Sequence, residues 1–296
     1  MTLTDLTSLE TPWEELWQKD TNATPFQSPA WQIPWIVHLW KGGELLLLQE
    51  RTDQKLTGFL PLFRWGINQT QVSFLGAGVS DYGDQLGSFR KLILPPDSLL
   101  EEVRQSSRLI QLGTANPISV CPVLSLKNYP ETLNPKLKTD LRRAKNKLAT
   151  NHRATFTRET NPEIFFKLHE LRWHQTAEPN LIAFQREIAQ RFSDRGLLRL
   201  HVLHIDEQPA AAIFAIAAHG TLYCYLSAFD PHFTKLSPGA VLLAHAIESA
   251  KAEGLTHADF LRGAEPYKYL WGAEDRVNFS VRPETNNSES TEPPAS

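Results

Sequence analysis

A pattern of short apolar runs separated by turn-forming residues occurs twice in this chain, and it limits the folds that the chain can adopt. The runs cover residues 43–51, 56–65 and 70–78 in the first half, and 197–205, 209–218 and 221–230 in the second. Short apolar or alternating runs bounded by turn residues are typical of strands joined by tight connections. Each half is therefore expected to contain a meander of three strands.

Helical segments precede both meanders, at residues 28–40 in the first half and at 161–175 and 181–192 in the second. Ser28 and Asn161 are each followed by proline, which is typical of a helix start. The chain thus predicts an α+β fold of three layers, with two tandem units that each have a mixed, mostly antiparallel sheet flanked by helices. Chance similarity between two common meanders is the alternative. We assign residues 1–133 and 154–282 to the two halves and 283–296 to a disordered polar tail.

An amphipathic helix is expected at residues 134–153, between the halves. Its apolar positions recur at helical spacing, and its remaining face is basic. It is either a solvated connection or a contact surface for an anionic substrate, tRNA or a membrane. The apolar positions are Leu137, Leu141, Ala144 and Leu148, and the basic ones include Lys138, Arg142, Arg143, Lys145 and Lys147.

The composition excludes several classes of protein. With 296 residues, 41% hydrophobic and 21% charged, the chain is long and apolar enough for a sizeable core. Its net charge of -3 gives no global reason to expect nucleic acid. Cys121 and Cys224 stand far apart in apolar runs and are expected to be buried thiols. The sequence shows neither a signal peptide nor an apolar run of about 18 residues, so we expect a cytoplasmic protein, with peripheral membrane contact left open.

The stretch from Ser227 to Gly254 is expected to be a strand end, a polar connection and a mostly buried helix that begins at "SPGA". Ser237 suits the N-cap, and Pro238 suits the first helical position. Gly239 and Ala240 leave the next backbone N–H groups uncovered, and such a helix end can bind a pyrophosphate. A capped helix without any ligand is the alternative.

A short segment that follows, residues 263–272, concentrates polar and aromatic groups. Glu265 is suited to accept a proton from an amine nucleophile, and Tyr267 or Lys268 to donate one to a leaving group. In the alternative, the aromatic residues belong to the core and Glu265 pairs with Lys268 at the surface. No HExxH or GxSxG sequence occurs, so the metalloprotease and α/β-hydrolase classes have no support.

The corresponding place in the first half, "FLGAGVSDYGDQLG" at residues 74–87, is rich in glycine but has neither P-loop nor dinucleotide spacing. Asp81 and Asp84 are suited to bind an amine, a sugar hydroxyl, or a metal with ligands from elsewhere. Formation of turns by Asp and Gly is the alternative.

The stretches "PFQSPAW", "FLGAGVSDYGD", "LSAFDPHFTKLSPGAVLL" and "DFLRGAEPYKYLWGA" together resemble the GNAT acyltransferase superfamily, in particular its CelD-like branch, which is similar to the Fem-type aminoacyl-transferases. The resemblance implies two GNAT-like units and acyl-CoA as a co-substrate, with no permanently bound cofactor. By this resemblance, the backbone of Leu226, Ser227 and Phe229 would hold pantetheine, and Leu236 to Ala240 would face the pyrophosphate. The usual glycine loop is reduced here to "KLSPGA". Because Fem-type relatives use aminoacyl-tRNA, that donor is the alternative.

The sequence as a whole therefore predicts an N-acyltransferase that moves an acyl group, most simply acetyl, from acyl-CoA to an amine, in cell-envelope or polysaccharide metabolism. Aminoacyl transfer from tRNA to a peptide or lipid, and a non-catalytic scaffold role, are the alternatives. No resident metal is expected. The residues assigned to the acceptor are Asp81, Tyr82, Asp84, Arg172, Arg262 and Trp271.

Overall fold

The computed structural model describes residues 3–66, 68, 70–173 and 178–284. The N-terminal half begins with helices α1 (Leu3–Lys19) and α2 (Pro29–His38). An antiparallel sheet follows, with strands β1 (Glu44–Thr52), β2 (Lys55–Trp65), β3 (Gln71–Phe74) and β4 (Leu86–Gly87). The first predicted meander is thus confirmed. Ser28 caps α2 as predicted, because its Oγ accepts a hydrogen bond of 3.3 Å from the backbone N–H of Trp31.

An eight-stranded sheet holds the C-terminal half together, in the order β5-β12-β6-β11-β10-β9-β8-β7. The second predicted meander, β8–β9–β10, is antiparallel, and the pair β10–β11 is parallel. This mixed, mostly antiparallel arrangement confirms the predicted α+β class. The strands are β5 (Leu100–Arg104), β6 (Gly113–Ser125), β7 (Ala154–Glu159), β8 (Leu198–Ile205), β9 (Gln208–Ala218), β10 (Thr221–Phe229), β11 (His257–Asp259) and β12 (Glu274–Pro283).

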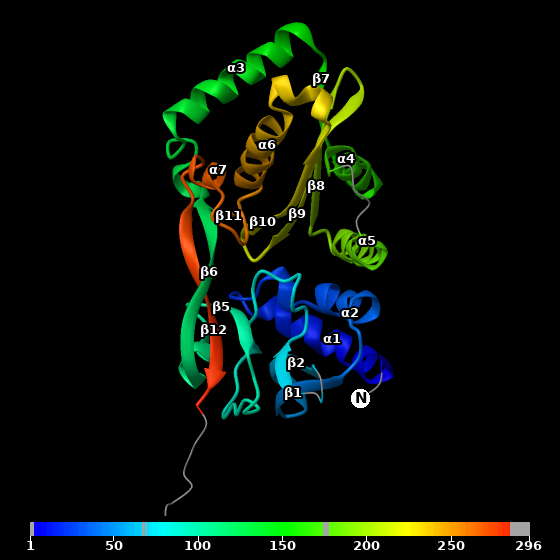
Figure 1. The fold of residues 1–296 in the computed structure, drawn as a ribbon, viewed down its shortest axis with the longest axis vertical. Coiled ribbons are helices and arrows are strands. Elements are labelled where there is room, and N and C mark those ends of the chain that lie inside the picture. The colour runs from blue at the N-terminus through cyan, green and yellow to red at the C-terminus, as the bar shows by residue number, and fades with distance from the viewer. Residues whose placement is uncertain (1–2, 67, 69, 174–177, 285–296) are drawn as a thin grey trace, which may run out of the picture.

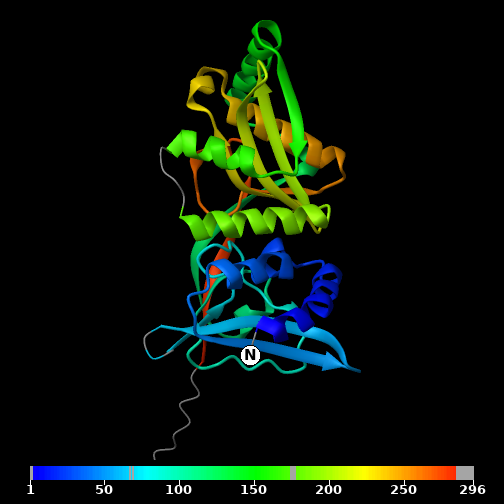
Figure 2. The same ribbon diagram turned by 90° about the vertical axis from the view of Figure 1, so that its right-hand side faces the viewer.

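Helices cover both faces of this sheet. One face carries α3 (Pro135–Asn151) and α6 (Pro238–Ala252), and the other carries α4 (Glu163–Trp173) and α5 (Pro179–Asp194) (Figures 1 and 2). Alternate residues of β9 belong to the two cores, because successive side chains of a strand point to opposite faces. Ala211 and Ile213 pack on the α6 side, whereas Ala212 and Phe214 pack on the α5 side. Because both faces of β9 are buried, this strand requires a continuous run of apolar residues.

The two halves share one sheet, which the sequence pattern did not indicate. β5 and β6 come from the first half, but β6 pairs with both β11 and β12, so that β6 and β12 run side by side from the lower to the upper half of the molecule in Figure 1. The strand β12 includes Pro283, the first residue assigned to the tail, and residues 285–296 lie outside the described residues.

Short helices complete the described chain. α7 (Pro266–Tyr269) follows β11, and the 3-10 helices are η1 (Pro25–Gln27), η3 (Arg108–Leu112), η4 (Leu126–Asn128) and η5 (Pro231–Leu236). Among the described helices, none is both long and apolar enough to cross a membrane.

Candidate active site

A cavity of about 630 Å³ opens between β10, the start of α6 and the segment that follows β11. Its wall is mostly apolar, with polar side chains from α4, β10, α7, the segment after β11 and the loop between β3 and β4. Most of the residues that the sequence singled out line this one cavity. They are Asp81, Arg172, Leu226, Ser227, Phe229, Gly239, Ala240, Arg262, Glu265, Tyr267, Lys268 and Trp271.

The cavity exists because β10 and β11 separate. Their parallel pairing covers only three residue pairs and ends where Tyr223 meets Asp259. β10 then continues to Phe229 along β9, with a bulge between Cys224 and Leu226. Past Tyr223, the edge of β10 that faced β11 therefore borders the cavity instead of another strand. Backbone N–H and C=O groups on such an edge can pair with an extended ligand, as a neighbouring strand would.

The first turn of α6 forms one end of the cavity. A Cβ built on Gly239 would have as its nearest neighbour Cδ1 of Phe229, at 3.8 Å, so the backbone here is open to approach. Orphan N–H groups and the positive end of the dipole make this end suited to an anion. Pro238 begins the helix as predicted, but Ser237 has left-handed backbone angles of φ 51° and ψ 49° and makes no side-chain cap bond. Leu236 is buried under α6, and neither it nor Ser237 lines the cavity.

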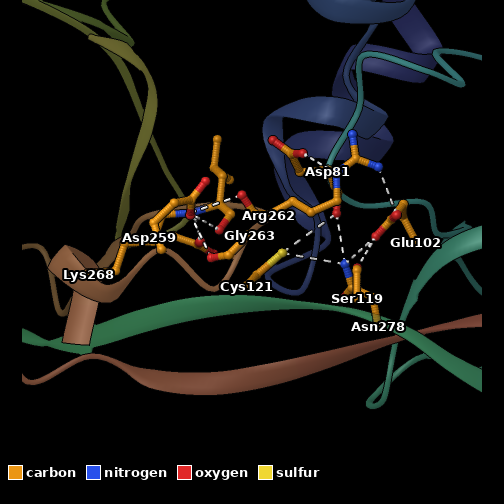
Figure 3. Close-up of polar contacts among 11 residues, drawn as sticks. Asp81, Glu102, Ser119, Cys121, Asp259, Arg262, Gly263, Lys268 and Asn278 are labelled. Carbon is orange, nitrogen blue, oxygen red and sulfur yellow. Dashed lines mark hydrogen bonds and ion pairs between the residues drawn. The ribbon is translucent and has the colours of Figure 1, made fainter.

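Lys268 fixes the loop that forms another wall. Its side chain is buried, and Nζ lies 3.0 Å from the carbonyl oxygens of Leu261, Arg262 and Gly263 (Figure 3). The carboxylate of Glu265 accepts from the same ammonium at 2.9 Å. Burial alone would raise the pKa of Glu265. The hydrogen bond and the charge of Lys268 act in the opposite direction and, with a backbone hydrogen bond, have the larger combined effect, so the pKa of this carboxyl lies below its ordinary value. The structure thus contains the ion pair between Glu265 and Lys268 that was the alternative prediction, although only Glu265 lies at the surface.

Tyr267 faces the cavity with a side chain that is about half exposed. Burial raises its pKa to about 12, so the phenol carries its proton at neutral pH. The thiol of Cys224 also lines the cavity, and burial raises its pKa to about 12 as well. A protonated phenol can donate to a thiolate, whereas a protonated thiol is a poor nucleophile.

Of the three candidates in the loop between β3 and β4, the structure brings only Asp81 to the cavity. The Tyr82 hydroxyl is buried and donates a hydrogen bond of 2.7 Å to Oδ2 of Asp259. Asp84 is buried elsewhere, where its carboxylate accepts from Arg104 at 2.9 Å and from Ser107 at 2.6 Å. Tyr82 and Asp84 therefore make structural contacts in this state, while Asp81 is open to a ligand.

Arg172 and Arg262 both line the cavity. The guanidinium of Arg172 stacks on the ring of Phe229, with its Cζ 4.1 Å from the ring centroid, which keeps a cation beside the open edge of β10. Arg262 bridges two carboxylates, with Nε 3.3 Å from Asp81 and Nη1 2.8 Å from Glu102. Trp271, which is almost fully buried, contributes packing.

Sequence reasoning missed two residues of this polar network. Glu102 and Asn278 lie on β5 and β12, and the Asn278 amide donates 2.9 Å hydrogen bonds to Glu102 and to the carbonyl of Asp81. No local pattern marks either residue, because Asn278 is more than a hundred positions away from both Glu102 and Asp81 in the chain. The part of the chain that the structure describes contains no group of His, Cys, Asp and Glu side chains placed to hold a metal ion.

Residues 135–269 match the family model of the acetyltransferase (GNAT) domain. This part of the chain is therefore similar to a GNAT acetyltransferase domain, and the cavity at the separated strands lies within the matched region apart from Asp81, Leu270 and Trp271. No curated protein matches the sequence.

Solved structures share the fold at low sequence identity. FemX has a TM-score of 0.63 at 10% identity, covering 92% of this chain and 95% of its own. A conserved protein of unknown function from Bacteroides thetaiotaomicron has a TM-score of 0.62 at 14% identity, covering 96% and 98%. L-PGS from Bacillus licheniformis has a TM-score of 0.57 at 10% identity, covering 82% and 86%. These similarities extend over both halves of the chain.

Proposed function

We propose that this protein is an N-acyltransferase that moves an acyl group from acyl-CoA to an amine. The observation that carries the proposal is the opening between β10 and β11, with the uncovered first turn of α6 at its end. The edge of β10 from Leu226 to Phe229 would pair with the amides of pantetheine, and Gly239 and Ala240 would face the pyrophosphate. Such a co-substrate implies a cytoplasmic enzyme.

Tyr267 is the group best suited to protonate the departing thiolate, because it lines the cavity and keeps its proton at neutral pH. Lys268 uses its N–H groups on three backbone carbonyls, so its contribution would be to hold the loop in shape. Glu265, which the sequence suggests as the base, stays a prediction. Its ion pair with Lys268 keeps it ionised but weakly basic.

Substitution of Gly239 tests the donor site. Gly239→Asp places a carboxylate where the pyrophosphate would bind, while an acidic residue in the first turn is favourable for the helix itself. Calorimetry should detect binding of acetyl-CoA and longer acyl-CoAs to the wild type and at least a tenfold loss, about 1.4 kcal/mol, in this variant. Gly239→Asn is the matched control, because it has the same size without the charge, and it should retain more of the affinity. Absence of binding of every acyl-CoA by the wild type would refute the proposal.

Aminoacyl-tRNA is the second candidate donor, and the exposed basic face of α3 favours it. Lys138, Arg142 and Arg143 are exposed on this helix, and Leu137 of the same helix lines the cavity. If tRNA is the donor, activity should fall steeply with rising salt and with Arg142→Ala and Arg143→Ala. If acyl-CoA is the donor, these substitutions should change its binding little.

The finer assignments remain proposals from the sequence. These are the CelD-like branch, an acceptor from envelope or polysaccharide metabolism, and the division into halves at residues 133 and 154. A cleft blocked at Gly239 would favour the non-catalytic alternative, and the open space around that residue argues against it.

A further inference from the structure

Asp81 is the contribution of the N-terminal half to the cavity. Among the described residues that line it, Asp81 alone comes from residues 1–133. It lies in the loop between β3 and β4, far in sequence from every other lining residue. The site of the proposed reaction is therefore composite, and the residue that the first half supplies is a carboxylate.

Contacts from the C-terminal half hold Asp81 in place (Figure 3). The Asn278 amide donates a hydrogen bond of 2.9 Å to its main-chain carbonyl, and the neighbouring Tyr82 hydroxyl is bonded to Asp259, the last residue of β11. Its carboxylate meets Nε of Arg262 at 3.3 Å. Because Arg262 also binds Glu102, at 2.8 Å, the arginine has an anchor that does not depend on Asp81.

The position of Asp81 along the cavity matches the expected place of a thioester. Phe229, near the end of β10, lies beside Gly239 and hence beside the phosphate end of the proposed ligand. A ligand that runs back along β10 from there reaches Cys224 and Tyr225, where β10 and β11 part. Asp81 lies at this second end, because its partner Arg262 follows β11 after only two intervening residues.

The carboxylate of Asp81 also has suitable acidity. Burial raises its pKa to about 6, against the lowering effect of Arg262. It is therefore ionised at neutral pH and yet more basic than an ordinary aspartate. The ionisable groups around it come from every neighbouring element and are Tyr82, Glu102, Cys121, Tyr225, Asp259, Arg262 and Lys268.

We infer that Asp81 is the general base of the proposed transfer, taking a proton from an acceptor amine that approaches from the side of the N-terminal half. This inference rests on the proposed function. The neutral amine attacks the thioester carbonyl, the new C–N bond forms, and one N–H proton passes to Asp81. The C–S bond then breaks, and Tyr267 protonates the CoA thiolate. Asp81 loses its proton to solvent and Tyr267 regains one, so the overall reaction is amine plus thioester to amide plus thiol.

Arg262 is a positioning residue in this scheme. Its ion pair restrains the Asp81 carboxylate and favours the ionised form, while the bond to Glu102 fixes the guanidinium in place. Asp81→Asn retains the size and the Asn278 contact to the backbone, so the fold and the donor site should persist.

The test compares Asp81→Asn with Glu101→Gln, a variant that removes one exposed carboxylate from β5 outside the main cavity. Release of CoA thiol is followed with acetyl-CoA and three primary amines, namely spermidine, glucosamine and a lysine peptide. Should none of them react with the wild type, water serves as the acceptor. Asp81→Asn should bind acetyl-CoA within about twofold of the wild type but lose about 100-fold or more in turnover. In the wild type, protonation of Asp81 should lower the activity below about pH 6, and this decrease should be absent in Asp81→Asn. Glu101→Gln should retain the wild-type profile.

Several results would overturn the assignment. Asp81 is not the base if turnover of Asp81→Asn stays within about threefold of the wild type. It is also not the base if the decrease in activity below pH 6 persists in Asp81→Asn but disappears in Glu265→Gln. The assignment would also be overturned if the wild type did not accelerate release of CoA thiol with any of these acceptors. These outcomes leave acyl-CoA binding intact. Failure of the wild type to bind acetyl-CoA would instead refute the proposed function itself.

Discussion

At the scale of single residues, the ammonium of Lys268 organises the wall of the cavity. It is buried, and it serves three backbone carbonyls of one loop together with the carboxylate of Glu265. A carbonyl left without a donor in such a place costs much more than the loss of an exposed ion pair. The two partners of this ion pair should therefore differ strongly in their effect on stability.

We expect Lys268→Met to lower the free energy of unfolding by about 3 kcal/mol, because three carbonyls lose their donor. Glu265→Gln, the control, removes only the half-exposed partner and should cost less than about 1 kcal/mol. Urea unfolding of the two variants measures both values. Equal costs would mean that the loop does not depend on the buried ammonium.

At the scale of elements, β8 and α6 enclose a histidine that makes stability depend on pH. His201 of β8 is buried, and its ring centroid lies 5.7 Å from that of His245 on α6. Burial, helped by the charge of Arg158, lowers the pKa of His201 to about 4. In the unfolded chain the pKa returns to about 6.5. Between these values the unfolded chain binds the extra proton, so acid favours unfolding.

The free energy of unfolding should accordingly fall as the pH is lowered from about 6.5 to 4, with His201 contributing up to about 1.4 kcal/mol per pH unit. His201→Gln should reduce this slope. His232→Gln on η5 is the control, since that side chain is 90% exposed, and it should leave the slope unchanged. Denaturant titrations at a series of pH values provide the measurement, and identical slopes in all three proteins would contradict this account.

The elements also show which features a sequence pattern can predict. The two meanders and the starts of α2 and α6 depend on local periodicity, turns and proline positions, and they were predicted. β6 was not, because Pro117 and Pro122 interrupt its pattern and its partner β12 lies more than a hundred residues away. Asp81 and Asp84 look alike in their shared loop. Only the tertiary ion pair to Arg104 shows that Asp84 is structural.

At the scale of the whole molecule, the halves form one body. The first half supplies β5 and β6 to the large sheet. A single hydrophobic core also crosses between the halves, where the rings of Trp31 and Phe184 lie 5.1 Å apart and those of Phe26 and Tyr223 lie 6.4 Å apart. Contacts of this kind couple the unfolding of one half to that of the other.

The described chain should therefore unfold in one cooperative transition. Most of the eight tryptophans lie in the first half, so tryptophan fluorescence reports mainly on that half, whereas far-UV circular dichroism reports on both. The two denaturation curves should coincide. Two separated transitions would show that the shared sheet and core couple the halves only weakly.

We expect the space between β10 and β11 to hold acyl-CoA, with its phosphates at the start of α6. Hydrogen–deuterium exchange with saturating acetyl-CoA tests this most directly, because the claimed contacts involve backbone N–H groups. We predict slower exchange at residues 225–229 and 239–241, with no change in β1 and β2. Unchanged exchange at both stretches, or protection only elsewhere, would contradict the account.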